Sequence, residues 1–72
     1  MKLSARNAMS GTIVELVKGA TTATVKLQVA PGLVITSSIT NEAVDALGLQ
    51  KGRSALAIIK SSDVILAVDD SD

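Results

Sequence analysis

Two short segments of the chain combine a cationic side chain with hydroxyl groups, and both suit an anion. In Ser4-Ala5-Arg6-Asn7, Ser4 offers a hydroxyl and Arg6 a guanidinium, which favours two-point contact with oxyanions. In Lys60-Ser61-Ser62, a cation precedes two hydroxyls directly after an apolar run. The same residues also fit a solvated Arg6 on an edge strand and a plain polar turn at residues 60–62. The pattern therefore allows an anion site without requiring one.

A third set of donors lies at Thr40-Asn41-Glu42-Ala43, which the pattern predicts to begin a short helix. Helix N-termini expose unpaired N–H groups and carry about half a positive charge. Thr40 can therefore cap the helix or donate to a ligand. The residues alone favour the cap.

The composition argues against an enzyme and against two classes of partner. Histidine and cysteine are absent, and Ser37-Ser38 has no base to activate it. Seven basic and seven acidic residues give zero net charge, and aromatic residues are absent, so the basic, aromatic surface of a nucleic-acid-binding module is missing. Apolar runs are too short to span a membrane, and the polar start at residues 4–7 lacks a signal-peptide pattern. We expect a soluble, cytoplasmic protein.

The elements that would position these donors are short strands separated by glycine turns and by Pro31-Gly32. β-like runs occupy residues 3–7, 12–18, 22–29, 33–39, 54–60 and 63–68, and residues 40–48 carry a helix signature with Gly48 at its end. Strict alternation of Ala23, Val25, Leu27 and Val29 predicts a half-buried antiparallel strand. We predict an all-β protein: an OB-type antiparallel barrel of about five strands with one short helix. A single domain over residues 1–68 would end in an acidic tail, 69–72.

A chain of 72 residues has a marginal core, and it lacks the disulfides or soft metal ligands that would reinforce one. Residues 55–59 and 64–68 are apolar on both faces of their predicted strands. A strand that is apolar on both faces must be covered on both sides, so we expect part of this surface to pack against another subunit. The sequence therefore predicts a homo-oligomer.

Several stretches resemble the molbindin (Mop) family, whose module is also known as the TOBE domain. They are Ser4-Ala5-Arg6-Asn7, Gly11-Thr12-Ile13-Val14, Ile39-Thr40-Asn41-Glu42, Leu47-Gly48-Leu49 with Gly52, and Ala57-Ile58-Ile59-Lys60-Ser61-Ser62. The resemblance implies OB-type barrels that assemble as hexamers, as trimers of dimers, with an N-terminal strand that can be exchanged. It also implies oxyanion pockets at subunit interfaces, with molybdate as ligand and tungstate as a close mimic.

The same resemblance implies roles for particular residues. Ser4, Arg6 and the backbone near Ala5 would lie at the oxyanion pocket, and Lys60 and Ser61 would reach it across the interface. A further contribution would come from the donors at the helix start, Thr40 and Ala43. The family often has serine where this chain has Ala43, so only a backbone N–H could act there.

The function implied is intracellular binding, storage and homeostasis of molybdate. Two alternatives remain open at the level of sequence: a structural oligomerisation domain and an OB-type nucleic-acid-binding module.

Overall fold

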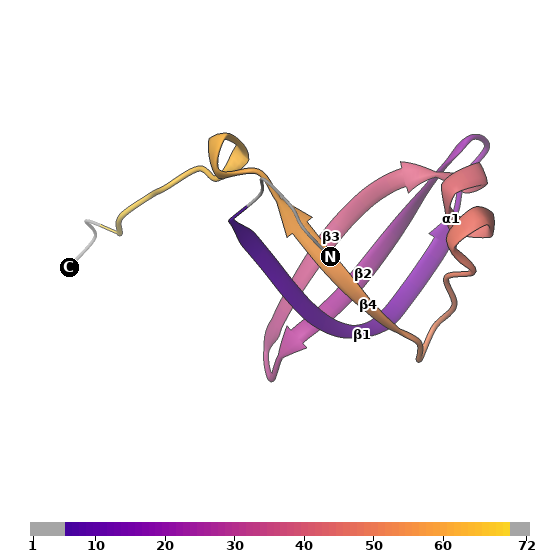
Figure 1. Ribbon diagram of the computed structural model, residues 1–72, viewed down its shortest axis with the longest axis horizontal. Helices are drawn as coiled ribbons and strands as arrows, with labels where there is room; N and C mark the ends of the chain where they lie inside the picture. The colour runs from indigo at the N-terminus through magenta and orange to yellow at the C-terminus, as the bar shows by residue number, and fades with distance from the viewer. Residues whose placement is uncertain (1–5, 70–72) are drawn as a thin grey trace.

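The computed structural model describes residues 6–69, in which four strands form one curled antiparallel sheet with a short helix at one end (Figure 1). The strands are β1 (Asn7–Lys18), β2 (Thr22–Ala30), β3 (Leu33–Thr40) and β4 (Ser54–Ile59), and the helix is α1 (Asn41–Leu47). The sheet order is β3-β2-β1-β4, which leaves β3 and β4 at the edges. The predicted all-β antiparallel class with one short helix is confirmed. No helix among residues 6–69 is long and apolar enough to cross a membrane.

Strand β1 organises the sheet because it pairs with two different neighbours along its length. Its first half pairs with β4, from Asn7 opposite Ile59 to Thr12 opposite Ser54. The part from Thr12 onward pairs with β2, with a register shift between Ile13 and Glu15. Figure 1 shows β1 bending between these two halves. The bend curls four strands into a half-barrel in place of a flat sheet.

The prediction that Gly11 separates two strands, at residues 3–7 and 12–18, is wrong. β1 runs without interruption from Asn7 through Gly11, while residues 3–5 lie outside the described part of the chain. At Gly11 the strand passes so close to β2 that a methyl group there would collide with the carbonyl oxygen of Gln28. This glycine is needed because two backbones approach each other closely. From the sequence alone, a glycine of this kind cannot be distinguished from a glycine in a turn.

The core lies on the concave face and is small. The alternation predicted for β2 is confirmed, because Ala23, Val25 and Leu27 are all buried. Ile13 from β1 and Val44 from α1 complete the set of five buried apolar residues, with exposed fractions of 1% and 2%. So small a core leaves much of the apolar surface of this chain in contact with solvent.

Helix α1 has the ends that the sequence predicts. The hydroxyl of Thr40 accepts a hydrogen bond from the Ala43 N–H at 3.0 Å, which is an N-cap. Gly48 ends the helix in the left-handed region with φ 64°, where glycine carries no Cβ penalty. The Lys18 ammonium lies 2.6 Å from the Asp45 carboxylate and ties the helix to the end of β1.

The strand predicted over residues 63–68 does not form in the described chain. β4 is followed by a single 3-10 turn, η1 (Ser61–Asp63), and residues 64–69 then continue in extended form without strand pairing. Figure 1 shows this segment leading away from the sheet. The apolar sequence predicts burial, but Ile65, Leu66 and Val68 are almost fully exposed in one copy. Of the predicted acidic tail, 69–72, only Asp69 is described.

We predict that Gly11→Ala lowers the free energy of unfolding by about 1–3 kcal/mol, because the added methyl group forces β1 and β2 apart. Urea denaturation at one fixed protein concentration measures the change. Ser10→Ala, at an exposed neighbouring position in the same strand, is the matched control and should shift stability by less than about 0.5 kcal/mol. Equal stability of the Gly11→Ala variant and the parent would contradict the close approach.

Candidate functional site

The pairing of β1 with β4 brings two of the predicted donor segments to one end of the sheet. The last registered pair is Asn7 opposite Ile59, and the Asn7 side-chain amide donates to the Ile59 carbonyl at 3.3 Å. Arg6 immediately precedes this pair and Lys60 immediately follows it. Two residues far apart in sequence therefore emerge side by side from neighbouring antiparallel strands.

These donors are available to a ligand. Arg6, Lys60 and Ser61 are all exposed, and neither cation has an ion pair with residues 6–69. The backbone around Lys60 is fixed by η1, because the Asp63 N–H donates to the Lys60 carbonyl at 2.9 Å. A cationic pair with a nearby hydroxyl is a donor set that suits an oxyanion. The negative charge of Asp63 lies in the same turn and opposes an anion there.

The third donor set lies at the opposite end of β1. Thr40 pairs with Thr22, and the neighbouring Ala23 pairs with Lys18, the last residue of β1. Arg6 precedes the first residue of the same strand, so the two donor sets are about 40 Å apart along the contour of β1, which bends between them. One copy of the chain does not bring Thr40 or Ala43 together with Arg6 and Lys60. Ser4 and Ala5 lie outside the described residues.

Two backbone N–H groups at the start of α1 already donate hydrogen bonds within the chain. The Ala43 N–H donates to the Thr40 hydroxyl, and the Asn41 N–H donates to the Thr21 carbonyl at 2.9 Å. Thr40 therefore acts as the cap that the residues alone favoured. Ligand contact at this end would have to compete with, or add to, these bonds.

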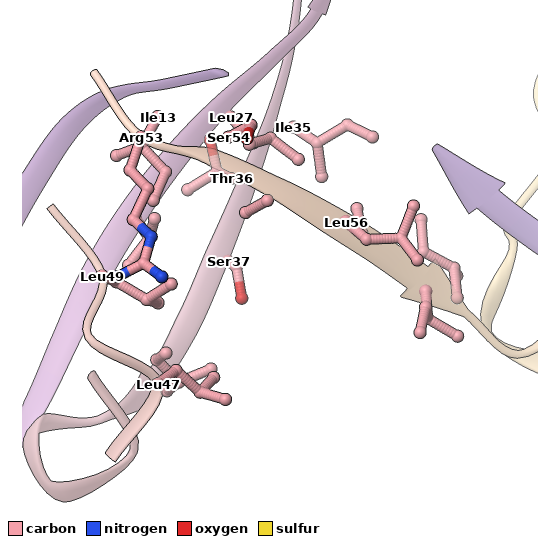
Figure 2. Close-up of a pocket in the computed structure, with 16 residues that line it drawn as sticks. Ile13, Leu27, Ile35, Thr36, Ser37, Leu47, Leu49, Arg53, Ser54 and Leu56 are labelled. Carbon is pink, nitrogen blue, oxygen red and sulfur yellow. The ribbon is translucent and has the colours of Figure 1, made fainter. Parts of the chain in front are cut away.

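Sequence reasoning missed the groove on the concave side of the half-barrel (Figure 2). It has a volume of about 620 Å³ and lies between the two edge strands, and none of the predicted site residues lines it. Arg53 is its cationic residue, and the guanidinium is held by the Gly48 carbonyl at 2.6 Å. Most other lining residues are apolar, among them Ile13, Val25, Leu27, Ile35, Ile39, Leu47, Leu49, Leu56 and Ile58.

The chemistry of this groove does not suit a small dianion. Removing such an ion from water is costly unless hydrogen-bond donors surround it, and aliphatic side chains offer none. The groove suits an apolar segment of protein. The groove could have been located only by knowing which strands form the two edges of the sheet, and the sequence does not specify the strand order. Within residues 6–69, no cluster of three or more acidic ligands is placed to hold a metal cation.

Comparison with known proteins gives consistent matches over nearly the whole chain. The TOBE domain family matches residues 3–66. Molybdenum-pterin-binding protein 1 of Clostridium pasteurianum is 46% identical over 66 residues, covering 92% of this chain and 97% of the relative. The relatives are named as binding or transport proteins, and the prediction that this chain is not an enzyme is confirmed.

Solved structures share both the fold and the sequence. MopII from Clostridium pasteurianum, in an apo form, superposes with a TM-score of 0.87 at 42% identity, covering 93% of this chain and 100% of that one. The cytoplasmic molybdate-binding protein ModG, with molybdate bound, has a TM-score of 0.92 at 49% identity. That match covers 96% of this chain and 49% of ModG. The predicted OB-type likeness to molbindins is confirmed.

We predict that Thr40→Ala destabilises the fold by about 1 kcal/mol, because the first turn of α1 loses its side-chain acceptor. Thr40→Ser keeps an acceptor oxygen and should retain most of the stability. Thermal unfolding at matched protein concentration, without any anion, measures both variants. If Thr40→Ala were as stable as the parent, the cap would contribute nothing to the fold.

Proposed function

We propose that this chain, which belongs to the TOBE domain family among the molbindin (Mop) proteins, binds molybdate in sites formed between copies of itself. The observation that carries the proposal is the β1–β4 register, which places Arg6 beside Lys60 and Ser61 at one exposed end of the sheet. The names of the relatives and the molybdate bound to ModG support the identity of the ligand.

The donor set matches the chemistry of a tetrahedral dianion. Molybdate offers only acceptors, and the proposed site supplies three donors to it: the Arg6 guanidinium, the Lys60 ammonium and the Ser61 hydroxyl. Two positive side chains balance the two negative charges of the ion. Phosphate keeps a proton for part of the time at neutral pH and needs an acceptor facing it, which neither cation provides, so the two cations favour a fully deprotonated dianion. Sulfate carries no proton, so pocket size must exclude it.

Several copies of the chain are needed to complete such a site. Three exposed donors on one edge leave much of the ion in water, and the donors at Thr40 and Ala43 lie at the far end of the same chain. We infer that a second copy supplies the remaining contacts, with Ser4 and the backbone at Ala5 adding to the first set. A homohexamer built as a trimer of dimers is the assembly that the family resemblance implies.

The biological role that fits this site is storage and homeostasis of molybdate in the cytoplasm, with tungstate able to take its place. A carrier of this kind needs reversible binding and no catalytic group. Titratable pairs of the sort used in acid–base catalysis are not found among the described residues, where the two ion pairs are exposed structural contacts.

A structural oligomerisation domain is the second candidate, and a specific observation favours it. Leu56 and Ile58 on β4 are each 43% exposed, and Ile65 and Leu66 are almost fully exposed, so the chain carries surface that needs a partner with or without a ligand. The two functions differ in one measurable way. A specific ligand stabilises the folded assembly, whereas a purely structural domain has the same melting temperature with and without molybdate.

We predict that equilibrium dialysis finds saturable binding of molybdate and tungstate, with weaker retention of sulfate and the weakest retention of phosphate. The order follows from a site with two cations that favours a fully deprotonated dianion and accommodates a large tetrahedron. Equal and weak retention of all four ions would refute the proposal. The melting temperature, measured in parallel with the same ions, should rise with molybdate.

We predict that Lys60→Ala and Arg6→Ala each weaken molybdate binding by about 1.5–3 kcal/mol, which is about 10- to 150-fold in Kd, because each removes a charge-assisted contact. Lys51→Ala is the matched control, since Lys51 is an exposed lysine in a turn outside the proposed site. Dialysis measures all three Kd values. An unchanged Kd in both site variants would show that the ion binds elsewhere.

A further inference from the structure

Asn41, the first residue of α1, ties the helix to the turn between β1 and β2. Figure 1 shows α1 lying beside this turn. The Asn41 side-chain Nδ2 donates to the Gly19 carbonyl at 2.9 Å, and the Asn41 backbone N–H donates to the Thr21 carbonyl at the same distance. Because two groups of one residue bind two points of one short turn, both the position and the direction of the helix start are fixed.

The same side chain also holds a polar atom in an unfavourable state. Asn41 Oδ1 is buried and has no hydrogen-bond partner in the described part of the chain. An unpaired buried acceptor opposes folding by at least as much as one ordinary hydrogen bond favours it, so the side chain of Asn41 adds little to the stability of the fold. Groups of this kind call for an explanation, and functional sites are where such local conflicts are retained.

Thr40, which directly precedes Asn41, carries one of the donors that the proposed function assigns to the ion. Its hydroxyl oxygen accepts from the Ala43 N–H at 3.0 Å, and the hydroxyl proton is still available to a ligand. Because this bond fixes the hydroxyl relative to the helix backbone, the direction of the proton depends on where the first turn of α1 is held. Asn41 holds that turn.

The second tie between α1 and the sheet is of a different kind. The Lys18 ammonium lies 2.6 Å from the Asp45 carboxylate, and the two side chains are 44% and 69% exposed. An exposed ion pair between flexible side chains contributes little energy and defines a position poorly. Asp45 also lies one turn beyond the start of the helix. The ion pair therefore restrains the body of α1, whereas Asn41 restrains its first turn.

We propose that Asn41 is a positioning residue of the molybdate site, which holds Thr40 in the orientation that the ion requires. The inference rests on the proposed function and adds a residue that is not itself a donor to the ion. Asn41 acts through Thr40. A site that separates large from small tetrahedral ions needs donors that are held in place, because mobile donors adapt to the smaller ion. Loss of Asn41 therefore lowers selectivity for molybdate over sulfate as well as affinity.

Equilibrium dialysis of Asn41→Ala against molybdate and sulfate measures the effect on binding. We expect the Kd for molybdate to rise about 3- to 10-fold, and the Kd for sulfate to rise less, because the lost hydrogen bond no longer orients Thr40. The matched control is Lys18→Ala/Asp45→Ala, which removes the other tie, leaves the net charge unchanged and should shift each Kd by less than about twofold. An Asn41→Ala variant that binds both ions as the parent does would overturn the proposal.

A double-mutant cycle with Thr40→Ala separates positioning from a general effect on the fold. If Asn41 acts through Thr40, the variants Thr40→Ala and Thr40→Ala/Asn41→Ala have the same Kd for molybdate, because no hydroxyl is left to orient. All Kd values are measured at a temperature where thermal unfolding shows every variant to be folded. If Asn41→Ala weakened binding by the same factor with and without the Thr40 hydroxyl, Asn41 would not act through Thr40.

A measurement without any anion distinguishes this proposal from the proposed function. Amide hydrogen exchange at Ala43, followed by NMR, reports how firmly the first turn of α1 is held. Exchange of the Ala43 N–H should be about 3- to 10-fold faster in Asn41→Ala than in the parent, and nearly unchanged in the control. A parent that retains no molybdate would overturn the proposed function and this inference together. A parent that binds molybdate, with equal exchange at Ala43 in parent and Asn41→Ala, would overturn the inference alone.

Discussion

The double pairing of β1 is the constraint on which the rest of the structure depends. One strand of twelve residues joins β4 with its first half and β2 with its second, and the backbones cross closely where Gly11 faces Gln28. Because Gly11 carries no side chain, the backbones of β1 and β2 can approach each other there. The bend of β1 between its two pairings sets the curl of the sheet, the position of the small core and the opening between the two edge strands.

The sequence predicts the local elements well because their signals are local. Alternation in Ala23, Val25 and Leu27 specifies β2 and its buried face, and Thr40 with Gly48 specifies both ends of α1. Gly11 was predicted to separate two strands because a glycine in a turn and a glycine at a close approach of two backbones are identical in sequence. Only the pairing of distant strands tells the two apart.

The site shows a similar division. The types of Arg6, Lys60 and Ser61 indicate anion chemistry, but their proximity follows from the register of Asn7 with Ile59, which the amino-acid pattern does not contain. The strand predicted at residues 63–68 fails for a related reason. An apolar segment indicates that something must cover it, and says nothing about which surface or which molecule does so. The groove could not be predicted either, because it lies between the two edge strands and depends on the order of the strands in the sheet.

The order of the elements along the chain separates assembly into two kinds of event. β1, β2 and β3 form consecutive hairpins, so their contacts join residues near in sequence and can form quickly within one molecule. Residues 64–68 follow β4, and the side chains of Ile65, Leu66 and Val68 are almost fully exposed in one copy. Burial of these side chains by another molecule would be a second-order encounter, whose rate falls on dilution. A dilute chain would therefore keep uncovered apolar surface, which favours aggregation.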